Sequence, residues 1–276
     1  DEAERLAVVA RLLEHGFTRL EERYDCTGSI TYGGITWENW IEGFRGAYDV
    51  TEAIGDSCNT YYFRAAIDTP GFSEGWGPFV QALHDDALRL GYGEVIGVDV
   101  PGESAGRIPD AAWVREVKDT AWYPGYTLNT VIGQGDVLAT PLQTLRALSA
   151  YARNGDRVEP RLVTRVGAED RPVRTSYVEG TSWGVLQEGM REMITDYGTN
   201  YTLGPAANFP LELAGKTGTA QNGAGEHLEH TWFMAYWPAS SPEVAVVGFL
   251  ENAGSSTRTA VPLVRDFLVA YYGLPD

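Results

Sequence analysis

The sequence predicts an α+β fold, in which a helix-rich part over residues 1–200 precedes a sheet and a closing helix over residues 211–276. Two patterns carry this prediction. Apolar residues recur at helical spacing through much of the first part, and three short runs rich in β-branched and aromatic residues follow in the second. No internal repeat or obvious linker divides the chain, so residues 1–276 are expected to form one α+β unit.

Five segments of the first part show helical periodicity, and local residues indicate where two of them begin. Thr51 is a candidate N-cap, and Pro141 suits a first helical turn because no partner is needed there for an N–H. Residues 24–40 are expected to be a loop or short hairpin, and residues 97–109 a loop. The five expected helices span residues 2–16, 50–66, 76–91, 142–151 and 181–196.

Strand-like patterning dominates the second part. The runs 213–220, 231–237 and 243–250 are short and bounded by Gly, Pro or Ser, as is typical of successive strands. A last apolar segment, 259–272, is expected to form a helix laid on the sheet.

Composition excludes several classes of function. The chain has 38 acidic and 21 basic residues and a net charge of −17, so it lacks the clustered cations that bind a phosphate backbone. It contains no apolar run of about 18 residues, the length that a transmembrane helix needs. Residues 1–5 are polar and acidic, so any export signal is expected outside this chain.

Two cysteines, Cys26 and Cys58, allow either two buried thiols or one bridge, and composition alone favours thiols because free Cys is commonly buried. A zinc site built from Cys and His lacks partners, since His15 and His84 are isolated and only one short His pair follows. We therefore expect no metal and no cofactor.

Lys216-Thr217-Gly218-Thr219 lies on the first predicted strand and contains one of only two lysines, the other being Lys118. An ammonium, two hydroxyls and a glycine on one strand offer an edge that binds an anion. The alternative is a surface strand with its polar residues facing water.

Ser57-Cys58-Asn59 lies inside the predicted helix 50–66. Ser and Asn form helices weakly, so placing both in mid-segment predicts a short break whose side chains point into a cleft. The alternative is a helix C-terminus with its usual polar residues, and this short pattern alone favours that alternative.

Together these two patterns are two of the three active-site motifs of the penicillin-recognising serine acyltransferases, whose third motif is S-x-x-K. The surrounding sequence resembles class B penicillin-binding proteins of the elongation type (penicillin-binding protein 2-like) over nearly the whole chain, in order and with sensible spacing. The resemblance implies a penicillin-binding/β-lactamase-like transpeptidase fold, with helices on both faces of an antiparallel sheet and a helical subdomain. The segments that carry it are residues 50–62, 132–136, 139–143, 214–221, 230–233 and 243–247.

The resemblance also implies a role for each motif residue. In the family, a serine attacks the D-Ala-D-Ala end of a peptidoglycan stem peptide, and β-lactams acylate the same serine. By position, Ser57 relays a proton, Asn59 hydrogen-bonds the substrate amide and Lys216 supplies positive potential. Thr217 and Thr219 bind the terminal carboxylate, Gly218 lies between them, and the N–H of Thr219 forms half of the oxyanion hole.

The chain departs from the family pattern at the nucleophile. No Ser is followed three residues later by Lys, and Glu2 and Arg5 stand where the nucleophilic Ser and its Lys belong. Arg keeps its proton and cannot serve as a base, so the chain is expected to be inactive by itself. It is a fragment, an altered version or a pseudoenzyme. The alternative functions are a non-catalytic module that binds β-lactam or peptidoglycan, or scaffolds partner proteins, and, less favoured, a serine β-lactamase.

Other departures affect the sheet and a metal position. Two family strands that precede the S-x-x-K helix are absent, which predicts an unpaired flank at residues 243–250. Some relatives hold zinc at positions that match Cys26, Asn39, Arg45 and Cys58, where the cation of Arg45 argues against a metal. The same match places Cys26 near Cys58, which makes a bridge as plausible as thiols.

One more departure concerns Tyr126, which replaces a common Asp, so substrate contacts there are in doubt. The resemblance further implies an extracytoplasmic location, a membrane anchor outside this chain, and partners among cell-wall elongation proteins.

Overall fold

The structure is a computed structural model that describes residues 13–14, 16–98, 101–197, 203, 211–222 and 228–274. The expected helix over residues 2–16 therefore lies almost wholly outside the described residues, which include helical conformation at Leu13 and Glu14. Within the described residues, no helix is both long and apolar enough to cross a membrane.

Helices make up most of the first part of the chain and return at its end. The α-helices are α2 (Val50–Gly55), α3 (Asn59–Ile67), α4 (Pro78–Leu90), α5 (Ala111–Lys118), α6 (Pro124–Thr130), α7 (Pro141–Ala152), α8 (Trp183–Thr195) and α10 (Ala260–Tyr272). The short 3₁₀ helices are η1 (Phe72–Glu74) and η2 (Ser256–Arg258).

The strands form several small sheets. They are β1 (Tyr24–Cys26), β2 (Ser29–Tyr32), β3 (Ile35–Glu38), β4 (Gly46–Tyr48), β5 (Asp156–Glu159), β6 (Arg165–Val166), β7 (Glu169–Asp170), β8 (Arg174–Tyr177), β9 (Ala214–Ala220), β10 (His230–Trp237) and β11 (Val244–Leu250). The predicted strands of the second part are confirmed as β9, β10 and β11, and the predicted closing helix as α10.

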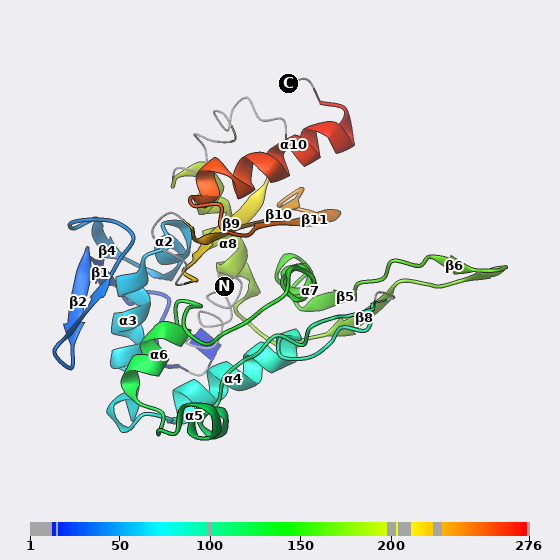
Figure 1. Cartoon of the computed structure of the whole chain (residues 1–276). Coiled ribbons are helices and arrows are strands. Elements are labelled where there is room, and N and C mark those ends of the chain that lie inside the picture. The colour runs from blue at the N-terminus through cyan, green and yellow to red at the C-terminus, as the bar shows by residue number, and fades with distance from the viewer. Residues whose placement is uncertain are drawn as a thin grey trace.

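The central sheet is antiparallel, with strand order β11-β10-β9 among the described residues. Because strand side chains alternate, β10 faces two cores. Phe233, Ala235 and Trp237 pack with α10, whereas Met234 and Tyr236 face the larger core that contains α7 and α8. Helices thus cover both faces, as Figure 1 shows with α10 on one side of the sheet and α7 on the other.

Both ends of this strand order lack a neighbouring strand in the described part of the chain. The expected unpaired flank at residues 243–250 corresponds to β11, which pairs with β10 alone and is half-buried under α7 and α10. The other edge is β9, which carries Lys216 to Thr219, so this edge matters for the site.

The expected helix over residues 50–66 is wrong as one piece. Two helices, α2 and α3, meet at a turn that contains Ser57, and Asp49 rather than Thr51 is the N-cap of α2. Asp49 Oδ1 accepts the N–H of Thr51 at 3.0 Å, and Asp, two residues before Thr51, is the better N-cap residue of the two. Glu52 closes a capping box with Asp49.

Helix α2 lies against α8 at very short range. A Cβ added at Gly189 of α8 would lie 2.5 Å from the Cβ of Ile54, so only glycine allows this approach. This packing fixes the C-terminal end of α2, and hence the turn at Ser57, relative to the sheet.

The remaining expectations were met within a few residues, but several elements were missed. Residues 24–40 contain the β2–β3 hairpin, and the helices expected at 76–91, 142–151 and 181–196 are α4, α7 and α8. Sequence patterning did not predict α5, α6 or the long two-stranded arm formed by β5–β8 and β6–β7. Figure 1 shows this arm projecting well beyond the helices.

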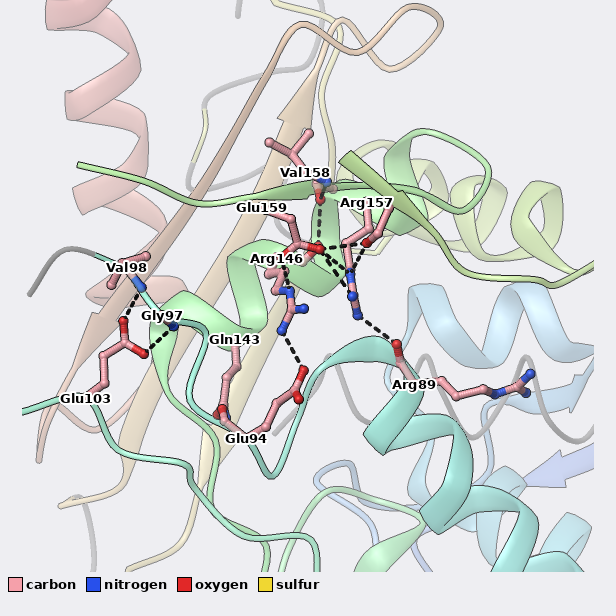
Figure 2. A network of polar contacts seen from close by, with 12 residues as sticks. Arg89, Glu94, Gly97, Val98, Glu103, Gln143, Arg146, Arg157, Val158 and Glu159 are labelled. Atoms are coloured by element: carbon pink, nitrogen blue, oxygen red, sulfur yellow. Dashed lines mark hydrogen bonds and ion pairs between the residues drawn. The ribbon is translucent and has the colours of Figure 1, made fainter. Parts of the chain in front are cut away.

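A buried arginine fixes the base of the arm. Arg146 of α7 is 7% exposed, and it pairs with Glu94 at 2.9 Å and with Glu159 of β5 at 2.7 Å. Arg157, also of β5, donates to the carbonyl of Arg89 at the end of α4. Figure 2 shows these contacts joining α4, α7 and β5, so ion pairs and hydrogen bonds attach the base of the arm to the helices.

Candidate active site

A cavity of about 500 Å³ runs along the free edge of β9. Its walls come mainly from six places that are far apart in the sequence: residues 38–40 at the end of β3, which include Asn39, the α2–α3 turn, the segment after α6, the end of α8, β9, and the segment 254–257 at η2. Ser57, Asn59, Thr217, Gly218 and Thr219 all line it. The structure thus brings the two predicted motifs to one cavity.

Ser57 occupies a position that normally belongs to glycine. The N–H of Ser57 donates to Ile54 O at 3.3 Å and the N–H of Cys58 to Ala53 O at 3.1 Å, the two bonds of a Schellman motif that ends α2. In this motif the residue after the C-cap is left-handed, and Ser57 has a φ of +55°. A left-handed non-glycine residue costs on the order of 1 kcal/mol and is characteristic of functional sites.

Lys216 is completely buried, and its ammonium reaches Ser57. Lys216 lies opposite Met234 in the register, so both side chains project from the face that packs against α7 and α8. Its Nζ donates to Ser57 Oγ and, at 3.0 Å, to the carbonyl of Thr217. A buried ammonium held by two oxygens places fixed positive charge beneath the cavity.

The backbone of β9 at Thr217 and Thr219 points away from the sheet. The N–H of Thr217 meets Met193 Sδ at 3.1 Å, its carbonyl accepts from Lys216, and the carbonyl of Thr219 accepts from Gln134 at 2.9 Å. In an antiparallel edge strand the N–H and C=O of one residue point the same way. The N–H of Thr219 is therefore directed outward at the cavity, as an oxyanion donor must be.

Gln134 and Ser256 also line the cavity, and neither was assigned a role from the sequence. Gln134 spans the strand end, since its Nε2 donates to Thr219 O and its Oε1 accepts from the N–H of Gln221 at 3.2 Å. Ser256, which is 5% exposed, exchanges a hydrogen bond of 2.8 Å with Thr219 Oγ1. The Gly-Gln-Gly segment could have drawn attention to Gln134, and the run of hydroxyls at 255–257 to Ser256.

Cys26 and Cys58 are joined by a disulfide between β1 and the start of α3, so the thiols favoured by composition are absent. The bridge implied by the resemblance is present. Asn39 donates from Nδ2 toward both sulfurs, at 3.5 Å and 3.6 Å. Sulfurs bonded to each other and an amide N–H turned toward them cannot bind zinc, and Arg45 reaches instead for Asp56 at 3.9 Å.

Negative groups lie close to the cavity as well. Burial raises the pKa of Asp56 above its ordinary value, while the hydroxyl of Tyr48, the guanidinium of Arg45 and the ammonium of Lys216 oppose that rise. Burial and the neighbouring carboxylates of Asp49 and Glu188 raise the pKa of Glu192 to about 7. Asp56, which lines the cavity, and Glu192, which lies behind Gly55, therefore take up protons more readily than ordinary carboxyl groups.

The remaining expected positions fall elsewhere. Glu2 and Arg5 lie outside the described residues. Tyr126 lies in α6, packed against Trp122 and Tyr123 with ring centroids 5.3 Å and 4.4 Å away, and it is not among the residues that line the cavity.

Comparisons with known proteins point in one direction. The sequence profile of the penicillin-binding protein transpeptidase domain matches residues 6–268. Among characterised proteins, the peptidoglycan D,D-transpeptidase MrdA of Acinetobacter baumannii is 30% identical over an alignment of 289 residues, gaps included, and the match covers 89% of this chain. The chain spans 41% of the length of that relative.

Solved structures agree with the sequence comparison. A chain of a peptidoglycan synthase complex that coordinates polymerisation and crosslinking superposes with a TM-score of 0.90 at 39% identity, covering 100% of this chain and 46% of that one. Penicillin-binding protein 2 of Helicobacter pylori, solved with MreC, gives a TM-score of 0.84 at 25% identity, covering 99% of this chain and 49% of that one.

Proposed function

The chain belongs to the penicillin-binding protein transpeptidase family, as a class B domain of the penicillin-binding protein 2 type, and we propose that its cavity binds the D-Ala-D-Ala end of a peptidoglycan stem peptide. One observation carries the proposal: Ser57, which accepts a hydrogen bond from the buried ammonium of Lys216, lines the same cavity as Thr219 of the free strand edge. The cavity of about 500 Å³ also suits β-lactams, which mimic the dipeptide.

Each group has a role in this binding. Lys216 supplies positive potential, and the hydroxyls of Thr217 and Thr219 bind the terminal carboxylate. Asn59 hydrogen-bonds the peptide amide, Gly218 leaves room for the ligand backbone, and the N–H of Thr219 polarises the scissile carbonyl. Ser57 lies where it passes a proton between Lys216 and a bound ligand.

We further propose that the chain by itself binds without forming an acyl-enzyme, because the family resemblance puts Glu2 and Arg5 at the positions of the nucleophile and its base. We also propose that the protein acts outside the cytoplasm with cell-wall elongation proteins as partners, which the complex of the Helicobacter pylori relative with MreC supports. The same replacement favours the second candidate function, a non-catalytic module that senses peptidoglycan or β-lactam or scaffolds partners.

Calorimetry and intact mass measured on the same samples test the proposal. Benzylpenicillin should bind reversibly with no mass increase, and Lys216→Met should abolish that binding. The double variant Glu2→Ser/Arg5→Lys should gain a covalent adduct equal to the mass of the β-lactam. An adduct on the unaltered chain would contradict the loss of acylation, and absence of any binding would contradict the assignment of the cavity.

A further inference from the structure

The start of α3 lacks a cap of its own. The side chain of the N-cap residue Cys58 accepts no backbone N–H of the first turn, because its sulfur is bonded in the disulfide and lies 3.3 Å from Thr60 Oγ1. A helix start leaves its first N–H groups in need of acceptors, and here one of them belongs to Asn59, which lines the cavity.

Asn39 supplies the missing acceptor. Its Oδ1 accepts the N–H of Asn59 at 3.1 Å and the N–H of Trp40 at 3.0 Å. Its Nδ2 donates to the carbonyl of Thr27 at 2.9 Å and faces the two sulfurs. The side-chain amide of Asn39 therefore joins the first residue of α3 to the segment after β1. Its oxygen accepts from Asn59, and its nitrogen donates to Thr27.

The disulfide and Thr60 hold the same connection from the other side. Both cysteines are fully buried, and Thr60 Oγ1 donates to Thr27 O at 3.1 Å while accepting the N–H of Thr27 at 3.0 Å. The backbone carbonyl of Glu38 accepts Nδ2 of Asn59 at 3.4 Å, which orients the side-chain amide of Asn59. The disulfide, the bond from Asn59 to Asn39 and the bonds between Thr60 and Thr27 thus hold residues 58–60, which directly follow the left-handed Ser57.

We propose that Asn39, seated on the Cys26–Cys58 disulfide, is a positioning residue that sets the orientation of Asn59 in the cavity. Positions that match a metal site in relatives thus form a metal-free brace in this chain. The role rests on the proposed function, in which Asn59 recognises the ligand amide.

The test compares ligands with and without a side-chain amide. Asn39→Ala should weaken binding of benzylpenicillin about tenfold, since it removes hydrogen bonds that hold the recognition group. Binding of penicillanic acid, which lacks the acylamino side chain, should change less than about twofold. In an Asn59→Ala background, Asn39→Ala should have no further effect, because there is no amide left to orient.

Three further variants and a ligand-independent measurement make the test complete. Asn39→Asp keeps the acceptor for Asn59 and should retain most of the affinity, whereas Cys26→Ala/Cys58→Ala should behave like Asn39→Ala. Hydrogen exchange at the N–H of Asn59 should accelerate in Asn39→Ala and stay slow in Asn39→Asp. Asn252→Ala, at an exposed contact with Asn222, is the control and should leave the exchange at Asn59 unchanged.

Equal loss of both ligands, or unchanged exchange at Asn59, would overturn the positioning role. If the unaltered chain bound neither ligand, the proposed function would fail, while the exchange experiment would still decide whether Asn39 holds Asn59. If Asn39→Ala failed to fold, Asn39→Asp and the cysteine double variant would carry the same comparison.

Discussion

The left-handed conformation of Ser57 leads to a prediction that separates strain from hydrogen bonding. Ser57→Gly and Ser57→Ala both remove the hydroxyl that accepts from Lys216, so they lose the same contact. They differ only in what a φ of +55° costs the residue that replaces serine. The difference in stability between the two variants therefore measures the backbone conformation at residue 57.

The expected difference follows from two opposing terms. Alanine in the left-handed region costs about 1–2 kcal/mol, whereas glycine adopts it freely. Glycine also gives the unfolded chain more conformational freedom, which offsets about 0.4–1 kcal/mol of that gain. Ser57→Gly should thus be more stable than Ser57→Ala by about 1 kcal/mol, with both below the unaltered chain because a buried ammonium has lost an acceptor worth about 1.5–3 kcal/mol.

Equilibrium unfolding in urea measures this difference, provided that the slope with denaturant is the same in both variants. In a thermal melt the separation should be on the order of 2 °C for a chain of this size. Both variants should lose affinity for benzylpenicillin to the same extent. If glycine proved no more stable than alanine, residue 57 would not be left-handed and the Schellman turn would be wrong.

Four other expectations follow from the site and its supports. Ser256→Ala should weaken carboxylate ligands several-fold but spare their carboxamide analogues, because Ser256 orients the hydroxyl of Thr219; equal loss of both would refute this, and titration calorimetry measures it. Gln134→Ala should cost about 1 kcal/mol in urea unfolding and lower affinity by freeing the end of β9, and unchanged affinity would contradict that role. Arg146→Met should lower the free energy of unfolding by about 2 kcal/mol, since Glu94 loses its partner and Glu159 keeps only Arg157 and Ser176; a neutral result would mean that the arm does not depend on Arg146. Native Glu192, whose pKa is about 7 against an ordinary 4.5, keeps a proton that the unfolded chain has released; the free energy of unfolding should therefore fall as the pH rises from about 5 to about 8, and Glu192→Gln should flatten that slope.

The sequence predicted those parts of the fold whose periodicity is local. The strands β9, β10 and β11 and the helices α4, α7, α8 and α10 were found because each buries a regular face. The break at Ser57 could be anticipated from weak helix formers, but its left-handed turn could not, because serine occupies a position that favours glycine. The arm was missed because its short strands bury almost nothing, and pattern reasoning depends on burial.

The site divides along the same line. Residues with a proposed role in ligand binding, such as Lys216 and Asn59, can be found from short sequence motifs. Residues that hold them depend on contacts between distant segments, such as Asn39 with Asn59 and Gln134 with Thr219, which no local pattern encodes. The preference for free thiols failed for that reason, since composition carries no information on the distance between two cysteines.

The unpaired edge of β9 offers little backbone to a foreign strand. Open sheet borders recruit foreign strands, yet here Met193 occupies the amide of Thr217 and Gln134 occupies the carbonyl of Thr219. Among the described residues, the backbone that remains available on this edge lies between these two contacts and is about as long as a dipeptide. A long foreign strand cannot form a continuous series of backbone hydrogen bonds with β9, whereas the end of a short peptide can bind between Met193 and Gln134.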